Sequence, residues 1–345
     1  MFQSRRCMVV GALLVLLLAA CGQSGAGTAA TALPQATQAP APTAMAEATT
    51  APAPAAMAEA TAAPAPTAMA EATAAPAPTA MAEATAAPAA GGDLLAEGKK
   101  RGKLLVATDA NYKPQSFKNS DGSFEGFDID VAKEVAKRLG VEAEFIDVNF
   151  DIITAGGWNN RWDMNAGSMT ITPDRKKSLY FSSPYYYTPA SFVVHKDSKA
   201  ASIDDLKGKQ VGVGAATTYQ DYLEGKLTLE DETILKPAPE GVTVKTYTSD
   251  VDALTDLALG NGTRLDAVLT ALPTADEAIK GGQPFKILGD PVYYEDLGLA
   301  FDQKSTLDSK GLADAVTKII DEMHTDGTLT KLAAKYYKSD LTTKT

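Results

Sequence analysis

The segment GFDIDVAKEVAKRLG, residues 126–140, is the most informative stretch of the chain for its fold. Its apolar residues recur at the spacing of one helix face, at Val131, Val135, Ala136 and Leu139. Asp128 can accept hydrogen bonds from the free amide groups at the start of such a helix, and Gly140 can end it. The segment therefore predicts a helix over residues 128–139.

Strands and helices alternate on both sides of this segment. Strands are predicted at KLLVAT (103–108), VEAEFIDV (141–148), KQVGVGA (209–215), VTVKTYT (242–248) and RLDAVLT (264–270). Further helices are predicted at residues 218–225, 251–259, 274–280 and 312–324. This alternation is typical of an α/β architecture built from crossover units.

Composition excludes several kinds of site. The chain has 345 residues, and its only cysteines are Cys7 and Cys21. The rest of the chain can therefore form neither a disulfide nor a thiolate metal site, and two histidines are too few for a histidine-rich one. The formal net charge is −11, and no basic stripe is interleaved with aromatic residues, which opposes nucleic-acid binding. We expect no metal and no cofactor.

The amino-terminal residues have the three parts of a secretory signal. Arg5 and Arg6 supply positive charge, residues 8–19 form an apolar run, and Leu-Ala-Ala-Cys, residues 18–21, resembles a bacterial lipobox. Residues 1–20 are therefore predicted to be removed and Cys21 to be lipidated, so that the protein lies outside the cytoplasm and is anchored to the cell membrane. The alternative, an uncleaved transmembrane anchor, is disfavoured because the apolar run is shorter than the ~20 residues that a span needs.

A repeating unit close to APAPTAMAEATA follows the signal, with methionines in register at Met45, Met57, Met69 and Met81. Its paired prolines favour an extended chain. Each unit is too short to hold a helix alone, and it has no apolar face to pack against its neighbours. Residues 21–92 are therefore predicted to be a disordered spacer.

Five motifs occur in the order and spacing of one protein family. They are TDANYKP (108–114), GFDIDVAKEVAKRL (126–139), GSMTITPDRKK (167–177), KGKQVGVGAATT (207–218) and DGTLTKLAAKYY (326–337). Over residues 104–338 the chain resembles the type II periplasmic amino-acid-binding proteins of ABC importers. The resemblance implies two α/β lobes joined by two hinge strands, with the ligand in the cleft between them. Residues 93–187 and 293–345 would form lobe 1, and residues 188–292 would form lobe 2.

The function that this resemblance implies is binding, with no catalytic residue. The protein would capture a small carboxylate, an amino acid or a close analogue, and deliver it to an ABC transporter permease. We expect it to act as a monomer. The alternative is an exported dehydratase on the same fold that acts on a prephenate-like acid. Such an enzyme needs a general acid aimed into the cleft, and the sequence identifies none.

The resemblance also implies how the ligand's carboxylate is bound. Arg175 matches the family arginine that holds this group, a task suited to a planar guanidinium making two parallel hydrogen bonds. Read without that context, Arg175 would be a solvated arginine in a charged turn. Ser168 and Thr170 would add a hydroxyl and an amide from lobe 1. Thr217 and Thr218 begin a predicted helix in lobe 2, so their amides would meet the same anion and couple binding to closure.

Four further residues match positions around the ligand's side chain. Tyr112 and Phe150 match aromatic residues that enclose it, with plain core packing as the alternative for both. Asp109 matches a residue that contacts the variable part of the ligand, although it could instead cap the turn before Asn111. Tyr219 follows the threonine pair, where a ligand-facing polar residue commonly lies.

One position departs from the family pattern. Relatives carry an acidic residue, paired with the ligand's α-ammonium, where this chain has Ala271. An ammonium group enclosed without a counter-charge costs about 3 to 5 kcal/mol. Either another acid replaces the missing one, or the ligand has no ammonium group. The candidates for such an acid are Asp109, Glu295 and Asp296, whereas Asp266 precedes the strand and is expected to lie away from the cleft.

Two segments are unusual. Trp158, in AGGWNNRWD (155–163), could reach the mouth of the cleft, but packing against the lobe is favoured, with Asn159 and Asn160 forming a turn. Residues 229–241 are rich in glutamate and proline and are interpreted as a surface insertion that the fold tolerates.

Overall fold

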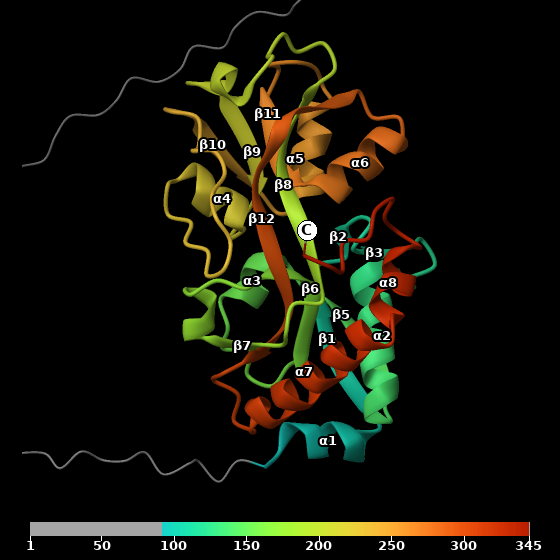
Figure 1. Ribbon diagram of the computed structural model, residues 1–345. Coiled ribbons are helices and arrows are strands. Elements are labelled where there is room, and N and C mark those ends of the chain that lie inside the picture. Colours follow the sequence, from blue (N-terminus) through green and yellow to red (C-terminus); the bar gives the residue numbers. More distant parts are fainter. Residues whose placement is uncertain (1–91, 345) are drawn as a thin grey trace, which may run out of the picture. The chain divides into compact units, whose positions relative to one another are not determined.

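The computed structural model describes residues 92–344, drawn as the coloured ribbon in Figure 1. The predicted signal segment, residues 1–20, the predicted lipidation site Cys21 and the spacer up to residue 91 lie outside the described residues. No helix within residues 92–344 combines the length and the apolar character needed to cross a membrane.

A mixed sheet of nine strands forms the centre of the described part of the chain (Figure 1). Its order is β10-β9-β11-β8-β12-β6-β1-β5, and β7 pairs with β12 beside this path. The strands are β1 (Lys103–Thr108), β5 (Glu142–Asp147), β6 (Met164–Thr170), β7 (Leu179–Phe181), β8 (Tyr186–His195), β9 (Gln210–Gly214), β10 (Thr243–Tyr247), β11 (Ala267–Ala271) and β12 (Phe285–Asp302). All five strands predicted from the sequence are confirmed, as β1, β5, β9, β10 and β11.

Lobe 1 is built around β1, which pairs in parallel with β5 and β6. Four helices share one apolar core with these strands: α1 (Leu94–Arg101), α2 (Phe127–Leu139), α7 (Ser309–Thr325) and α8 (Thr328–Ala333). The shorter elements of this lobe are α3 (Phe150–Thr154), the 3-10 turn η1 (Arg175–Lys177), and a small sheet of β2 (Asn111–Tyr112), β3 (Ser116–Lys118) and β4 (Phe124–Glu125).

The start of α2 differs from the prediction. Gly126, not Asp128, occupies the N-cap position, with a φ of 128°. A Cβ at Gly126 would lie 2.2 Å from the carbonyl oxygen of Gln115, so this close approach of two backbone segments requires glycine. The carboxylate of Asp128 is buried instead, and it accepts hydrogen bonds from the hydroxyls of Tyr185 and Ser168, each at 2.7 Å. The predicted cap at Asp128 is therefore wrong, because its side chain has partners inside the lobe.

Lobe 2 repeats the same construction. Strand β9 pairs in parallel with β10 and β11. The surrounding elements are α4 (Thr218–Leu223), α5 (Asp250–Leu257), α6 (Leu272–Lys280) and the 3-10 turn η2 (Ile203–Leu206). Two apolar clusters fill the space between the helices and the sheet. The helices predicted in this lobe are confirmed, with small shifts at their ends.

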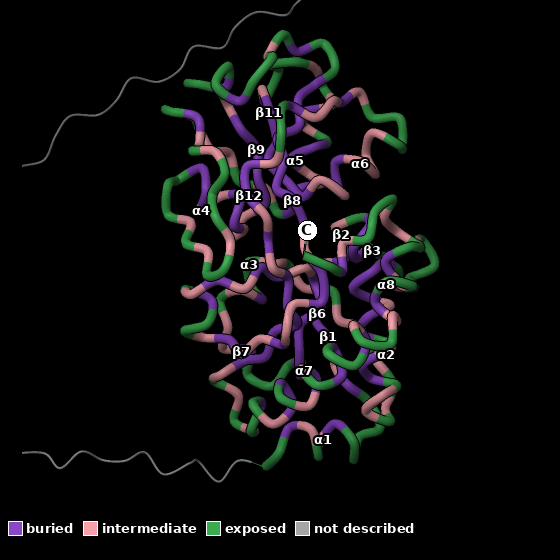
Figure 2. The backbone as a smooth tube through the Cα atoms, in the orientation of Figure 1, coloured by how far each residue is buried: buried purple, intermediate pink, exposed green. Residues whose placement is uncertain are grey.

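Two long strands, β8 and β12, join the lobes (Figure 1). They pair with each other in antiparallel fashion; β8 also pairs with β11 of lobe 2, and β12 with β6 and β7 of lobe 1. Figure 2 colours residues by burial: β8 is buried along almost its whole length, whereas β12 is buried in lobe 1 and includes intermediate and exposed residues in lobe 2. The predicted lobe boundaries, after residues 187 and 292, fall inside β8 and β12, and their exact placement stays a prediction.

Candidate functional site

The nine residues predicted to bind the ligand line one cavity between the lobes, which we call the cleft cavity. They are Asp109, Tyr112, Phe150, Ser168, Thr170, Arg175, Thr217, Thr218 and Tyr219. The wall also contains Asp250 and Glu295, which are not among the nine. The free space inside measures about 40 Å³. The structure thus brings the predicted residues together, while their contact with a ligand stays a prediction.

Arg175 connects the two lobes from inside the cleft cavity. Its side chain is buried, and its guanidinium donates to the carbonyl oxygen of Thr170 in lobe 1 and to that of Ala216 in lobe 2, each at 2.9 Å. The group lies over the ring of Phe150, 5.4 Å from its centroid. Burial lowers the pKa of Arg175, but guanidinium remains charged in proteins. Because these carbonyls use two of its five N–H groups, donors remain for an anion, and the solvated-turn interpretation is wrong.

The start of α4 supplies amide groups from the other lobe. Thr217 is the N-cap residue: its side chain accepts from the amide of Gln220, and its hydroxyl donates to the carbonyl of Gly214 at 2.7 Å. Among the residues that the structure describes, the backbone amides of Thr217 and Thr218 have no acceptor. Ala216, just before them, has a φ of 59°, an uncommon conformation for a residue with a side chain. Arg175 and two free amides therefore line one cavity from opposite lobes.

Glu295 lies on β12, where the lobes and the hinge strands meet. It is 2% exposed. Its Oε1 accepts from the hydroxyls of Thr170 and Thr218 at 2.7 and 2.5 Å, and its Oε2 accepts from that of Tyr219 at 2.7 Å. A buried carboxylate with this many donors is stabilised without a cation. A hinge-strand acid thus holds the side chains of three predicted ligand-binding residues, Thr170, Thr218 and Tyr219.

Two further carboxyl groups in the cavity wall have raised pKa values. Burial raises the pKa of Asp109 to about 6, with a smaller contribution in the same direction from Asp147. Burial also raises the pKa of Asp250 to about 7. Asp109 in addition accepts the amide of Asn111 at 3.0 Å, so the turn cap considered for this residue is present. Both acids can change their protonation near neutral pH, which is common in binding and catalytic sites.

The acids considered as substitutes for the one missing at Ala271 separate into two groups. Asp109 and Glu295 line the cleft cavity. Asp296 does not, since its Oδ2 accepts from Lys344 Nζ at 3.2 Å and it lines a different cavity. Asp266 accepts the amide of Gln210 at 2.9 Å and, as expected, is not part of the cleft cavity wall.

The aromatic residues combine packing with cavity lining. Tyr112, on β2 of lobe 1, packs against the core cluster of lobe 2, and its hydroxyl lies 3.3 Å from that of Tyr219. Phe150, the first residue of α3, is half-buried beneath the Arg175 guanidinium. The two interpretations considered for Tyr112 and Phe150 are therefore compatible.

Ser168 is held by a buried network that sequence reasoning missed. Its φ is 51°, its hydroxyl donates to Asp128, and its amide donates to the hydroxyl of Tyr185 at 3.2 Å. Burial raises the pKa of Asp128 to about 7. The available signal was an aspartate among the apolar residues at the start of α2, but only the fold shows which partner it meets.

Trp158 does not reach the cleft cavity. It is 1% exposed, its indole N–H donates to the carbonyl of Ile153 at 2.9 Å, and its ring lies 5.5 Å from that of Trp162. The ligand-contact alternative is wrong, because the side chain is enclosed in the core of lobe 1. The predicted turn is confirmed, with positive φ at Asn159 and Asn160. Within residues 92–344 no cluster of three or more potential metal ligands is found.

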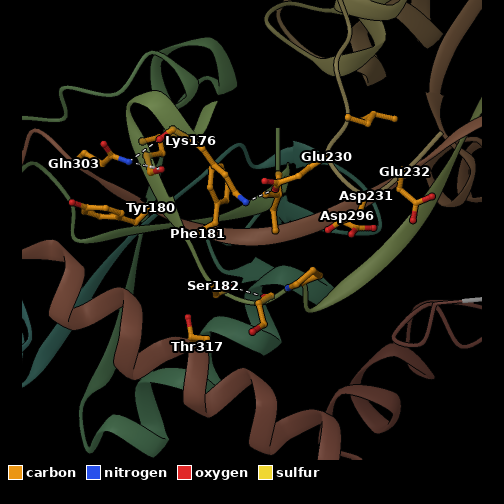
Figure 3. A pocket seen from close by; sticks show the side chains of 15 residues that line it. Lys176, Tyr180, Phe181, Ser182, Glu230, Asp231, Glu232, Asp296, Gln303 and Thr317 are labelled. Atoms are coloured by element: carbon orange, nitrogen blue, oxygen red, sulfur yellow. Dashed lines mark hydrogen bonds and ion pairs between the residues drawn. The ribbon is translucent and has the colours of Figure 1, made fainter. Parts of the chain in front are cut away.

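A second cavity, which we call the insertion cavity, measures about 380 Å³ and is lined by none of the nine predicted residues. Figure 3 shows Lys176, Tyr180 and Phe181 of lobe 1 on one side and acidic residues of the 229–241 insertion on the other. Glu230 forms an ion pair with Lys176, and Glu232 forms one with Lys344 at 2.8 Å. The insertion therefore contacts lobe 1 through ion pairs, and its interpretation as a tolerated surface loop stays a prediction.

Known proteins share both this fold and this sequence pattern. The L-cystine-binding protein TcyJ of Escherichia coli strain K12 is 34% identical over 72% of this chain and 88% of that protein. The L-arginine-binding protein of Pseudomonas aeruginosa is 32% identical over 69% of this chain and 89% of that protein. The crystal structure of the ancestral amino acid-binding protein AncCDT-1, a precursor of cyclohexadienyl dehydratase, is 33% identical, has a TM-score of 0.60, and matches 71% of this chain and 99% of that chain.

The model of one family covers most of the described residues. It is that of the bacterial extracellular solute-binding proteins, family 3, and it matches residues 104–339. These matches confirm the family and the type II two-lobed fold expected from the sequence motifs. The chain belongs to family 3 of the bacterial extracellular solute-binding proteins.

Proposed function

We propose that this solute-binding protein captures a small carboxylate, an amino acid or a close analogue, by lobe closure and delivers it to the permease of an ABC importer. The observation that carries the proposal is the position of Arg175, which contacts both lobes in a cavity also lined by Thr217 and Thr218. An anion there would interact with both lobes at once, so it would bind the closed state more tightly than the open state. The difference between these two affinities would favour closure.

Ligand screening of the full chain tests this proposal. We expect at least one amino acid to raise the melting temperature and to bind in calorimetry, and Arg175→Ala to abolish both effects. If no small carboxylate stabilises the protein, or if Arg175→Ala binds as tightly as the wild type, the proposed site is wrong.

We further propose that Cys21 carries a lipid and that the protein acts as a membrane-anchored monomer. The signal-like start and the spacer-like repeat support this placement. Metabolic labelling with a radioactive fatty acid should mark the wild type and leave Cys21→Ala unlabelled, with the variant lost from the membrane fraction. Equal labelling of both would exclude this anchor.

A dehydratase acting on a prephenate-like acid is the second candidate function. It is favoured by the Asp250 carboxyl group, whose pKa of about 7 suits a general acid, and by the similarity to a protein described as a precursor of a dehydratase. We prefer binding, since the curated relatives are binding proteins. Incubation with prephenate should give no aromatic product above the uncatalysed rate, and turnover would reverse this preference.

A further inference from the structure

The carboxyl group of Asp250 lies at the end of β11, although the residue itself belongs to helix α5. Its Oδ2 accepts from the hydroxyl of Thr270, the neighbour of Ala271, at 2.7 Å. Its Oδ1 accepts from the amide of Gly214 on β9, also at 2.7 Å. A Cβ on Gly214 would lie 2.8 Å from that Oδ1, so a larger residue at this position would displace the carboxyl group. Asp250 therefore reaches across from α5 to the ends of β9 and β11, and its carboxyl group lies in the wall of the cleft cavity.

The charges of the cleft cavity are unbalanced. Among its lining residues, all of which the structure describes, Arg175 is the one cation, while Asp109, Asp250 and Glu295 are acids. A ligand with a carboxylate alone would compensate Arg175 and would leave the acids without any cation. A ligand that also carries an ammonium group would meet an opposite charge, which a buried cation requires.

The three acids differ in their capacity to receive an ammonium group. A carboxylate offers about four acceptor positions. Glu295 accepts four hydroxyl hydrogen bonds, from Thr170, Thr188, Thr218 and Tyr219. Asp250 accepts only two and is 3% exposed, so it has acceptor positions left in a place shielded from water. Asp109 is more exposed and accepts the amide of its own turn.

We infer that the ligand is an amino acid with a free ammonium group, and that Asp250 is the residue that receives this group. The inference rests on the proposed function, in which Arg175 holds the ligand's carboxylate, and it assigns a second residue of the same cavity to the ammonium group. It makes Asp250 a specificity residue, because an ammonium group would favour the ionised form of this buried carboxyl group, whereas a carboxylate without an ammonium group offers it no opposite charge.

The test compares the standard L-amino acids with their deamino analogues, which keep the carbon skeleton and the carboxylate but have no ammonium group. The affinity for each compound is measured by calorimetry on the full wild-type chain and on the Asp250→Asn variant. Asparagine has the same shape, and it can still accept from Gly214 and donate to the Thr270 hydroxyl, so the fold should be kept. In the wild type we expect the amino acid of each bound pair to bind on the order of a hundredfold tighter than its deamino partner. Asp250→Asn should remove most of that difference by weakening the amino acid alone.

Asp256→Asn is the matched control, because it removes the same charge from the same helix at a residue that contacts Tyr247 and Arg264 instead of the cavity. It should leave both members of every pair unchanged. Deamino acids that bind as tightly as amino acids, or an Asp250→Asn variant that keeps the difference or weakens both members equally, would overturn the inference and leave the proposed function standing. If neither member of any pair binds the wild type, the proposed function itself fails and the inference fails with it.

Discussion

Two of the cavities between the lobes, the cleft cavity and the insertion cavity, are bordered by chemically different contacts. In the cleft cavity, Arg175 and Glu295 are buried and form hydrogen bonds with groups from both lobes. At the insertion cavity, the lobes are linked by ion pairs such as Lys176–Glu230, in which each side chain is 44% exposed. Arg175 and Lys176 are adjacent residues of η1, and the first contributes to the cleft cavity while the second contributes to the insertion cavity.

The difference between these contacts predicts how much each contributes to closure. An exposed ion pair is worth about 0 to 1 kcal/mol and is weakened by salt. Removing one partner of a buried, hydrogen-bonded charge pair costs about 2 to 5 kcal/mol. We therefore expect the cleft cavity to decide which ligand closes the protein, and the insertion contact to shift the balance between open and closed states only slightly.

The largest effect is expected from Arg175→Met, which keeps a long side chain but removes the charge. Amino-acid affinity should fall by about 2 to 5 kcal/mol, roughly 30-fold to several thousand-fold, because the carboxylate loses its cation. Lys176→Met is the control, since it makes the same change at the next residue and should alter affinity by less than about fivefold. Isothermal titration of both variants measures this, and equal losses would erase the proposed distinction between the cavities.

The next effect is expected from Glu295→Gln. The amide has fewer acceptor positions for hydroxyls that come from both lobes, so the free energy of unfolding should fall by about 1 to 3 kcal/mol. Asp296→Asn, one residue further along β12, removes the same charge where it faces Lys344 and should cost less than about 1 kcal/mol. Urea denaturation provides both values. An Asp296→Asn variant that is less stable than Glu295→Gln would show that Glu295 does not hold the lobes together.

The pH dependence of stability examines the buried acids inside and below the cleft cavity. Burial raises the pKa of Asp109 to about 6 and those of Asp128 and Asp250 to about 7. Each therefore binds its proton more tightly in the folded state, and its contribution to stability is lost as the pH rises through the folded-state pKa. Without added ligand, the melting temperature should fall between about pH 5 and pH 8.

The Asp128→Asn variant should show a smaller fall of the melting temperature with pH. The control Asp174→Asn, at an exposed residue, should show the same fall as the wild type. Scanning calorimetry across this pH range makes the comparison. A melting temperature that rises with pH, with no change in slope for Asp128→Asn, would show that these acids are ionised in the folded protein.

The smallest effect is expected at the insertion. The double variant Glu230→Gln, Glu232→Gln removes both ion pairs with lobe 1, at Lys176 and Lys344. Ligand affinity should change by less than about tenfold at low salt and should match the wild type at high salt, where exposed pairs are screened. Titrations at two salt concentrations suffice. A large loss that persists in high salt would give the insertion a direct role in closure.

Local patterns in the sequence predicted the regular elements well. The apolar spacing in α2 and the alternation of strands and helices depend on neighbours within one turn or one strand, and these elements are confirmed. Nine residues of the cleft cavity wall were predicted from the family resemblance, whose motifs include the short loops on which most of these residues lie. Arg175 is an example: the turn that holds it is encoded within a few residues.

Long-range contacts could not be predicted in this way. Asp250 appears in the sequence as an ordinary first residue of α5, and only the pairing of β9 with β11 brings Gly214 and Thr270 to its carboxylate. The burial of Asp128 likewise depends on Tyr185, which is 57 residues away along the chain. Trp158 was ambiguous because a tryptophan beside glycines suits either a cleft mouth or a core, and the packing of α3 decides between them.

The most direct test of the central claim is a crystal structure of the protein with its tightest-binding amino acid. We predict that the ligand's carboxylate lies within hydrogen-bond distance of Arg175 and of the amides of Thr217 and Thr218, so that both lobes hold one anion. A ligand bound outside the cleft cavity, or a carboxylate that contacts neither Arg175 nor these amides, would contradict the account.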